Sequence, residues 1–459
     1  MSSTAIAEPI NPLGQDPIFK LIVRFSLPAI VGMVVNALYN VVDRIYIGNA
    51  PGLGANGIAG ITIGFPIMII LMAFGVLFGI GGATLFSIRN GQKREEEAEE
   101  VLGNAFFLLV VGGILFMILG QIFLKPLLTL FGASAEVLPY SMEYMRVIFF
   151  GASFQITSMG LNHFIRGDGN PKIAMLTMFL GAGSNIILDP IFIYGFGWGM
   201  AGAAWATILS QSFSFIWVTS YFLGKKSKAK LRLKYMRPKW KIVTRITTLG
   251  IPSFVLQITS SLLNAVLNMT LMRHGGDLGI SAMGIVNSIQ TLLLMPVIGI
   301  NQGVLPIISF NYGAKKYERV KQATRQGIYS ATVLILIGYI ATRTIPELLV
   351  GMFNRDPALM ELGTFALKRW FLLTPITGFQ IVSGIFFQAI GRSNTAMVMT
   401  LTRQGLFLIP AILILASLYG LQGILWAAPI SDGLSTLIAA IFYIDGMKNL
   451  EKRALLKEV

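Results

Sequence analysis

The chain has 459 residues, of which 54% are hydrophobic and only 12% are charged, and its mean hydropathy is +0.70. Soluble globular chains carry about 25% charged residues, so this composition predicts a membrane protein with several spans. The sequence has no cysteine, which excludes disulfides, thiolate metal sites and cysteine nucleophiles. Its two histidines, His163 and His274, are far apart in sequence, so neither a histidine metal site nor a cofactor is expected.

Residues 1–17 are a polar, proline-containing tail without the apolar region of a signal peptide, so we expect no cleavage there. Beyond this tail, apolar runs long enough to cross a bilayer recur along the chain. They predict an all-α integral membrane protein with twelve transmembrane helices, near residues 18–48, 57–86, 101–123, 140–165, 172–195, 201–223, 246–273, 281–310, 322–346, 362–388, 394–417 and 421–443.

The net charge of +15 would suggest a nucleic-acid partner for a soluble chain, but here the basic residues follow the topology of the spans. Most lysines and arginines lie in the connections after even-numbered spans and in the C-terminal tail. The other connections hold only Lys125, Arg273, Arg343 and Arg355. By the positive-inside rule, both termini are expected to be cytoplasmic and the protein to reside in the cytoplasmic (inner) membrane. Orientation accounts for the positive charge, so no nucleic-acid partner is expected.

Residues recur between the two halves of the chain at a nearly constant offset. Pro28, Asn40, Gly60, Gly75 and Gly79 recur 224 positions later, and Gly91 and Lys93 recur 222 positions later, as Pro252, Asn264, Gly284, Gly299, Gly303, Gly313 and Lys315. Each half has an even number of predicted spans, so both halves enter the membrane from the same side. The pattern therefore predicts two parallel-repeat six-helix bundles with a central cavity between them.

The repeat also divides the chain into predicted regions. They are an N-terminal lobe, a basic cytoplasmic linker, a C-terminal lobe and a cytoplasmic C-terminal tail, at 18–223, 224–245, 246–443 and 444–459 respectively.

The first span carries a polar face that ends in a carboxylate. Asn36, Tyr39, Asn40 and Asp43 are spaced three, four and seven positions apart, so they share one side of a helix. An acid inside a membrane span costs about 2.5–3.5 kcal/mol on insertion scales and predicts a functional site. The simpler alternative for Asp43 is a hydrogen bond that packs two helices together.

A second group of polar residues lies in the fifth and sixth spans. Asn185 and Asp189 are four positions apart on one helix face, and Thr207 follows in the next span. The C-terminal half lacks these groups, because Leu267 aligns with Asp43 and Ala428 with Thr207. Two aspartates with neutral oxygens suit Na⁺ or a shared proton better than Mg²⁺. Asn and Thr side chains inside membranes also serve as interhelical hydrogen bonds, which is the alternative for Thr207.

Further residues are candidates for the transport path. Met33, Asn36, Gln155, Gln257 and Asp432 are candidates for a substrate pocket, and Pro28 and Gly32 could let the first helix bend. Asp432 has two interpretations, contact with substrate or a buried structural ion pair. Arg403 either pairs with an acid or extends its charge to the membrane surface.

Four segments together resemble the multidrug and toxic compound extrusion (MATE) family over nearly the whole chain. They are LYNVVDRIYIG at 38–48, FIRGDGNPK at 164–172, NIILDP at 185–190 and GAAWAT at 202–207. The resemblance is to the prokaryotic branch whose cation site lies in the N-terminal half. It implies that Asp43, Asn185, Asp189 and Thr207 hold H⁺ or Na⁺, with Tyr39 and Asn40 beside them.

The resemblance further implies a V-shaped pair of bundles that works as a monomer. Such a protein exports amphipathic, often cationic drugs or toxic metabolites in exchange for H⁺ or Na⁺, and it contacts membrane lipid. Gln257 stands where another branch has an acid, so the resemblance implies no cation site in the C-terminal half.

Three other functions fit the sequence less well. A flippase for a lipid-linked saccharide should have a strongly cationic cavity, for which Arg403 is the main candidate. An intramembrane enzyme should show a catalytic constellation, yet no HExxH or GxSxG arrangement occurs, so no enzyme is expected. No GxxxxGK[ST] pattern occurs either, so no nucleotide is expected to bind. A channel does not require the bendable helix and the asymmetric acids that favour a carrier.

Overall fold

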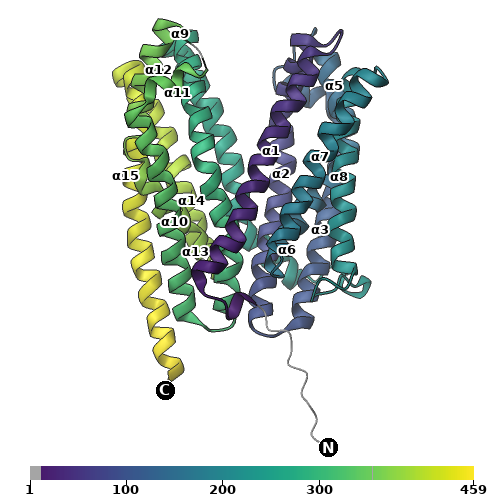
Figure 1. Cartoon of the computed structure of the whole chain (residues 1–459), viewed down its shortest axis with the longest axis vertical. Coiled ribbons are helices and arrows are strands. Elements are labelled where there is room, and N and C mark those ends of the chain that lie inside the picture. The colour runs from purple at the N-terminus through teal and green to yellow at the C-terminus, as the bar shows by residue number, and fades with distance from the viewer. Residues whose placement is uncertain (1–11, 354, 459) are drawn as a thin grey trace, which may run out of the picture.

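The structure is a computed structural model that describes residues 12–353 and 355–458. The predicted N-terminal tail therefore lies mostly outside the described residues. Within the described ranges the chain is helical and contains no strand, which confirms the predicted all-α class. Figure 1 shows two helical bundles that lean apart as a V, with the start of the first long helix and the end of the last one at the closed end.

The N-terminal bundle comprises α1 (Ile18–Asn49), α2 (Gly54–Gly91), α3 (Glu95–Ile122), α4 (Leu124–Leu130), α5 (Leu138–Phe150), α6 (Ala152–Gly167), α7 (Pro171–Pro190), the π-helical turn η2 (Ile191–Gly195) and α8 (Gly199–Leu223). The C-terminal bundle comprises α9 (Trp240–Gly313), α10 (Tyr317–Thr344), α11 (Pro346–Gly351), α12 (Pro357–Trp370), α13 (Thr374–Ala389), α14 (Ser393–Leu401), the π-helical turn η4 (Thr402–Leu408) and α15 (Ile409–Glu458). Two 3₁₀ turns, η1 (Pro12–Gly14) and η3 (Leu233–Tyr235), lie outside the long helices.

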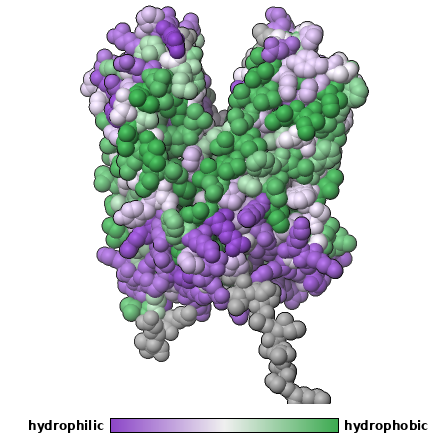
Figure 2. All heavy atoms as spheres, viewed as in Figure 1, coloured by the Kyte–Doolittle hydropathy of each residue, from purple (hydrophilic) through white to green (hydrophobic). Residues whose placement is uncertain are grey.

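Several of these helices can cross a membrane. Among the described residues, seven are long and apolar enough, and an eighth span results if the bent pair α12 and α13 is counted as one. The long helices α9 and α15 are each interrupted by a glycine with positive φ, Gly276 at 57° and Gly420 at 59°. On the face that Figure 2 shows, an apolar band crosses both bundles between hydrophilic ends. This arrangement is consistent with twelve spans.

The repeat detected in the sequence reappears in the backbone. Lys93 and Lys315, 222 positions apart, are the two non-glycine residues of the described chain with positive φ, at 58° and 56°. Left-handed backbone is uncommon for a residue with a side chain, so its recurrence at matching positions is strong evidence for the repeat. Gly52 and Gly276, 224 positions apart, also share positive φ. The two halves therefore fold alike.

The lobes exchange the first turns of their first helices. Ile18, Leu21 and Phe25 of α1 are buried in one apolar cluster with Val304 and Ile308 of the C-terminal bundle. In the same way, Ile246 and Leu249 of α9 are buried in the core of the N-terminal bundle. Helix α1 thus begins in the C-terminal lobe and ends in the N-terminal lobe.

Glycines bring the two lobes together at the closed end of the V. A Cβ added to Gly91 of α2 would overlap the backbone carbonyl oxygen of Phe310 of α9, and one added to Gly313 of α9 would overlap that of Ile88 of α2. These two contacts are related by the 222-residue repeat. Backbone therefore packs directly on backbone there, and only glycine permits that distance.

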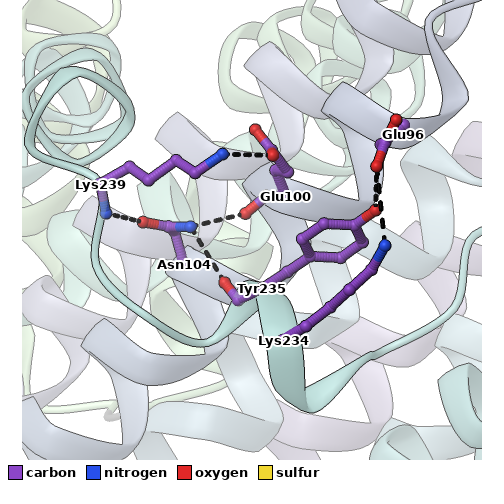
Figure 3. A network of polar contacts seen from close by, with 6 residues as sticks. All are labelled: Glu96, Glu100, Asn104, Lys234, Tyr235 and Lys239. Atoms are coloured by element: carbon purple, nitrogen blue, oxygen red, sulfur yellow. Dashed lines mark hydrogen bonds and ion pairs between the residues drawn. The ribbon is translucent and has the colours of Figure 1, made fainter.

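The linker between the lobes folds onto the start of α3 (Figure 3). Tyr235 donates a hydrogen bond of 2.6 Å to Glu96, and Asn104 donates one of 3.0 Å to the Tyr235 carbonyl oxygen. Lys239 pairs with Glu100, and Arg232 pairs with Glu99 at 2.8 Å. The acidic turn of α3 thus holds the basic linker against the N-terminal bundle.

Candidate functional site

The polar face of α1 is only partly buried. Asp43 lies inside the N-terminal bundle, where α1 packs on α7, and its side chain is buried. Tyr39, one turn earlier, is half-buried and interacts with Asp43 and Asp189. Asn40 is exposed, and its amide donates to the carbonyl oxygen of Asn36 on its own helix at 2.7 Å. The structure therefore brings Asp43 and Tyr39 together and leaves Asn40 at the margin.

The residues predicted on the fifth and sixth spans meet next to Asp43. The Asn185 amide of α7 donates to Asp189 Oδ1 at 3.2 Å and to Thr207 Oγ1 of α8 at 3.4 Å. Thr207 in turn donates to the Ala203 carbonyl oxygen at 3.1 Å. The Asp189 carboxyl contacts that of Asp43. Three helices thus contribute to one cluster, defined here as the N-lobe acid cluster: Asp43, Asn185, Asp189 and Thr207.

The local sequence around Asp189 ends the regular helix at this point. Pro190 follows directly, and the next five residues form the π-helical turn η2. Proline has no backbone N–H to donate, so the helical hydrogen-bond pattern has to change around it. π-Helical turns occur frequently at functional sites, in agreement with the position of this one beside two buried acids.

The cluster holds more acceptor oxygens than it has donors. Asp43 Oδ1, Asn185 Oδ1 and Asp189 Oδ2 are buried and have no hydrogen-bond partner among the described residues. The charge of the neighbouring Arg44 acts on Asp43, but its guanidinium lies 6.0 Å from the centre of the Phe65 ring and forms no ion pair within the described chain. Buried carboxylates normally find a partner, so these oxygens point to a group that the chain itself does not supply.

The donor set fits a small monovalent cation. The three unpartnered oxygens come from two carboxylates and an amide, and Thr207 adds a hydroxyl oxygen beside them. No group of three His, Cys, Asp or Glu side chains suited to a metal ion occurs in the described part of the chain. Oxygen ligands with two carboxylates can take up Na⁺, and one proton shared between the carboxyls would also reduce their repulsion.

The sequence analysis missed Tyr144 of α5. This tyrosine is 2% exposed, and its hydroxyl contacts the Thr207 side chain and faces Asp43 and Asp189. Helix α5 contacts α8 through tertiary packing that no spacing in the sequence reveals. The available signal was a tyrosine in a predicted membrane span, and that pattern is common.

The candidates for pocket and gate are distributed over both lobes. Gln302 of α9 donates to the Met33 sulfur at 3.6 Å, so α1 contacts the C-terminal lobe there. Gln155 and Gln257 are half-buried, on α6 and α9. Pro28 lies inside α1, which runs without interruption from Ile18 to Asn49. A Cβ on Gly32 would approach the Met178 sulfur of α7 to 2.6 Å, so α1 packs tightly against α7 at this position.

Of the two interpretations of Asp432, the structure contains the ion pair. Arg403 donates to Asp432 Oδ1 at 2.8 Å, and the Asp432 residue is only 2% exposed. The Ser431 hydroxyl donates to the Arg403 carbonyl oxygen at 2.6 Å and adds a second link between η4 and α15. Asp432 and Arg403 therefore neutralise each other inside the C-terminal lobe.

Comparison with known proteins confirms the family resemblance. A family model described as MatE matches residues 28–191 and again residues 252–414, one match in each half. The multidrug export protein MepA of Staphylococcus aureus (strain MRSA252) is 30% identical over 427 residues, which cover 93% of this chain and 94% of that protein. MepA of Staphylococcus haemolyticus (strain JCSC1435) is 28% identical over 435 residues, covering 95% of each chain.

Solved structures give the same result for the fold. A structure described as MATE in the bent conformation superposes with a TM-score of 0.91 at 26% identity, covering 96% of this chain and 98% of its own. One described as the outward-facing conformation of a multidrug resistance MATE family transporter of the MOP superfamily superposes with a TM-score of 0.89 at 25% identity, covering 97% and 99%.

Proposed function

Because the chain belongs to the MatE family, we propose that it is a secondary multidrug antiporter that exports amphipathic, often cationic compounds in exchange for H⁺ or Na⁺. The relatives named multidrug export proteins support the substrate class. The observation that carries the coupling is the set of unpartnered oxygens on Asp43, Asn185 and Asp189, in a cluster whose carboxylates form no ion pair among the described residues.

The orientation follows from the distribution of charge. The basic linker, the start of α1 and the end of α15 lie at the closed end of the V, so the positive-inside rule favours a cytoplasmic location for that end, in a cell with an inner membrane. The V then opens to the outside. In this state the N-lobe acid cluster is positioned to receive a cation from the external side and to release drug in the same direction.

Helix α1 connects the coupling site to the contact between the lobes. Its first turns pack in the C-terminal lobe, where Gly299 and Gly303 of α9 receive Ile30 and Ser26. Its last turns carry Asp43 into the N-terminal lobe. Pro28 and Gly32 lie where the helix passes from one lobe to the other, and a proline inside a helix is a common site of bending.

The proposed cycle uses this connection. Two adjacent buried carboxylates repel each other unless a proton or Na⁺ reduces their charge. Cation binding from outside would relieve that repulsion, let α1 repack against α7 and reduce the space available to drug. The empty carrier would then close outside and open inside, where the cation leaves. One charge moving through about 100 mV supplies about 2.3 kcal/mol, which corresponds to a gradient of about fiftyfold.

The flippase alternative is less compatible with this structure. A lipid-linked saccharide carries phosphate groups, so its carrier needs cations that are free to bind them. Arg403 was the main candidate, and its guanidinium is paired with Asp432 at 2.8 Å. The C-terminal lobe therefore does not offer that charge to a substrate.

The test is efflux from inverted vesicles with pH and Na⁺ gradients imposed separately. For the wild type, one of the two gradients should drive drug accumulation. Asp43→Asn and Asp189→Asn should each reduce driven transport to the level of vesicles without the protein. Neither should lower the thermal stability of the purified protein, because each change removes a buried charge that forms no ion pair.

Asp277→Asn is the matched control, because Asp277 is an exposed acid of α9 outside the cluster. Its transport should equal that of the wild type. Full gradient-driven efflux by Asp43→Asn, or wild-type efflux that depends on neither gradient, would contradict the proposal.

A further inference from the structure

A hollow opens beside the start of α1, at the closed end of the V. It has a volume of about 650 Å³ and lies between the first turns of α1 and the turn that joins α6 to α7. Its basic side chains are Lys20, Arg24 and Lys172, and Phe19 and Val23 form part of its apolar wall. It is separate from the N-lobe acid cluster, which lies further along α1.

The charges of this hollow are largely uncompensated. Arg24 pairs with Asp16 at 3.4 Å, and both side chains are well exposed to solvent. Lys20 and Lys172 are exposed and form no ion pair within the described residues. The carboxyl group of Asp168, in the same turn, is directed away, because it accepts hydrogen bonds from Tyr221 at 2.5 Å and from Ser227 at 2.9 Å. A net positive hollow therefore remains.

An exposed apolar face of α1 begins at this hollow and runs along the membrane-spanning part of the helix. Phe19, Val23 and Leu27 are 62%, 45% and 57% exposed, and their four-residue spacing forms one apolar stripe. The stripe continues along the helix through the exposed residues Val31, Val34, Leu38, Val41 and Ile45. Figure 2 shows that hydrophilic residues border the apolar band at this end of the molecule. The hollow therefore lies at the level of lipid headgroups.

We propose that this hollow binds the headgroup of an acidic phospholipid, with an acyl chain along Phe19, Val23 and Leu27. The phosphate and the net negative charge of the lipid would be met by Lys20, Arg24 and Lys172. Basic residues at a membrane surface attract anionic lipids, and long basic side chains reach the headgroup level while their stems cover apolar surface. The bound lipid would bridge the start of α1, which packs in the C-terminal lobe, and the α6–α7 turn of the N-terminal lobe.

Lipid binding to the purified full chain tests this proposal. The protein is titrated with phosphatidylglycerol and with phosphatidylcholine, and bound lipid is counted by native mass spectrometry. The wild type should retain phosphatidylglycerol in preference to phosphatidylcholine. The double variant Lys20→Gln/Lys172→Gln should bind phosphatidylglycerol about tenfold more weakly or worse, since each basic residue contributes to the attraction. Its melting temperature without added lipid should remain that of the wild type.

The matched control is Lys225→Gln/Lys226→Gln, which removes the same charge from two exposed lysines of the linker in the same lobe. It should bind phosphatidylglycerol as the wild type does. Equal loss of affinity in the control, or no preference of the wild type between the two lipids, would overturn the proposal. Displacement of the lipid by millimolar inorganic phosphate alone would overturn it as well, because the site would then bind a phosphate ion and not a lipid.

Discussion

The two lobes differ most at the positions of the N-lobe acid cluster. Asp43 and Thr207 are buried beside unpartnered oxygens, whereas their repeat counterparts, Leu267 and Ala428, belong to one buried apolar cluster of the C-terminal lobe. The C-terminal lobe does bury an acid, Asp432, but it supplies the neutralising Arg403 from the neighbouring helix. Within the described residues, Asp43 and Asp189 of the N-terminal lobe are buried and form no ion pair, unlike Asp432.

This difference separates a structural charge from an exchangeable one. A buried carboxylate paired with arginine is compensated throughout the cycle, so it contributes to the fold and gains little from an external cation. The N-lobe acid cluster gains neutralisation only from a particle that can arrive and leave. Under the proposed function, the duplicated scaffold would carry a coupling site in one copy and a packed core in the other.

The largest expected effect comes from breaking the C-lobe ion pair. Arg403→Gln would leave Asp432 charged and buried without its partner, at a cost of about 3–5 kcal/mol. The apparent melting temperature of the purified protein measures the loss. Adding Asp432→Asn in the same chain removes the unpaired charge and should restore most of the stability. If Arg403→Gln were as stable as Asp43→Asn, the contrast between the two lobes would be wrong.

The next effect tests a feature that the two lobes share. Gly91→Val would push the backbone of α2 away from α9 at the closed end, with an expected cost of about 1–3 kcal/mol. Because the chain has no cysteine, spin labels at Gln92→Cys and Lys315→Cys can report the separation of the lobes directly. The closed end should widen in the variant. Gly284→Val is the control, since no atom lies within 4 Å of an added Cβ there, and it should leave the separation unchanged.

A smaller effect is expected from Tyr144→Phe, which removes the hydroxyl that contacts Thr207. A neutral hydrogen bond is worth about 0.5–1.5 kcal/mol, so the coupling-ion concentration that gives half-maximal efflux should rise a few-fold. Tyr140→Phe changes the same residue type one turn earlier in α5 and should leave that concentration unchanged. An equal shift in both variants would exclude Tyr144 from the site.

The smallest effect concerns Asp168 in the α6–α7 turn, a further acid of the N-terminal half, whose position in the repeat is taken by Ile390. Burial raises the pKa of the Asp168 carboxyl above its ordinary value, although hydrogen bonds from Tyr221, Ser227 and the Lys228 backbone N–H oppose the shift. The folded protein therefore holds the Asp168 proton more tightly than the unfolded chain does. Through this carboxyl the fold is most stable at acid pH and loses stability as the pH rises through the raised pKa.

The apparent melting temperature of the purified protein, compared with that of Asp168→Asn from about pH 4 to pH 8, measures this contribution. The wild type should lose stability relative to Asp168→Asn as the pH rises. A pH dependence that persists in Asp168→Asn would assign it to another group.

The sequence by itself determined the membrane class, the helical fold and the duplication. Composition and the length of the apolar runs decide the membrane class and the helical fold, because a bilayer has no water to satisfy exposed backbone groups. The recurrence of Pro28, Gly91 and Lys93 revealed the duplication, since positions with the same backbone conformation in both halves require the same residue. The helical spacing of Asn185 and Asp189 also placed those two on one face, because their contact is local to a single helix.

Only the tertiary structure decided which distant groups meet. It brought Asp43 of α1 to Asp189 of α7, added Tyr144 from α5, and paired Arg403 with Asp432. It also placed the first turns of α1 in the opposite lobe and turned the acidic start of α3 into the docking surface of the linker. The physical reason is common to all of these. Contacts between helices depend on rotation, tilt and depth, which side-chain packing sets and helical periodicity does not encode.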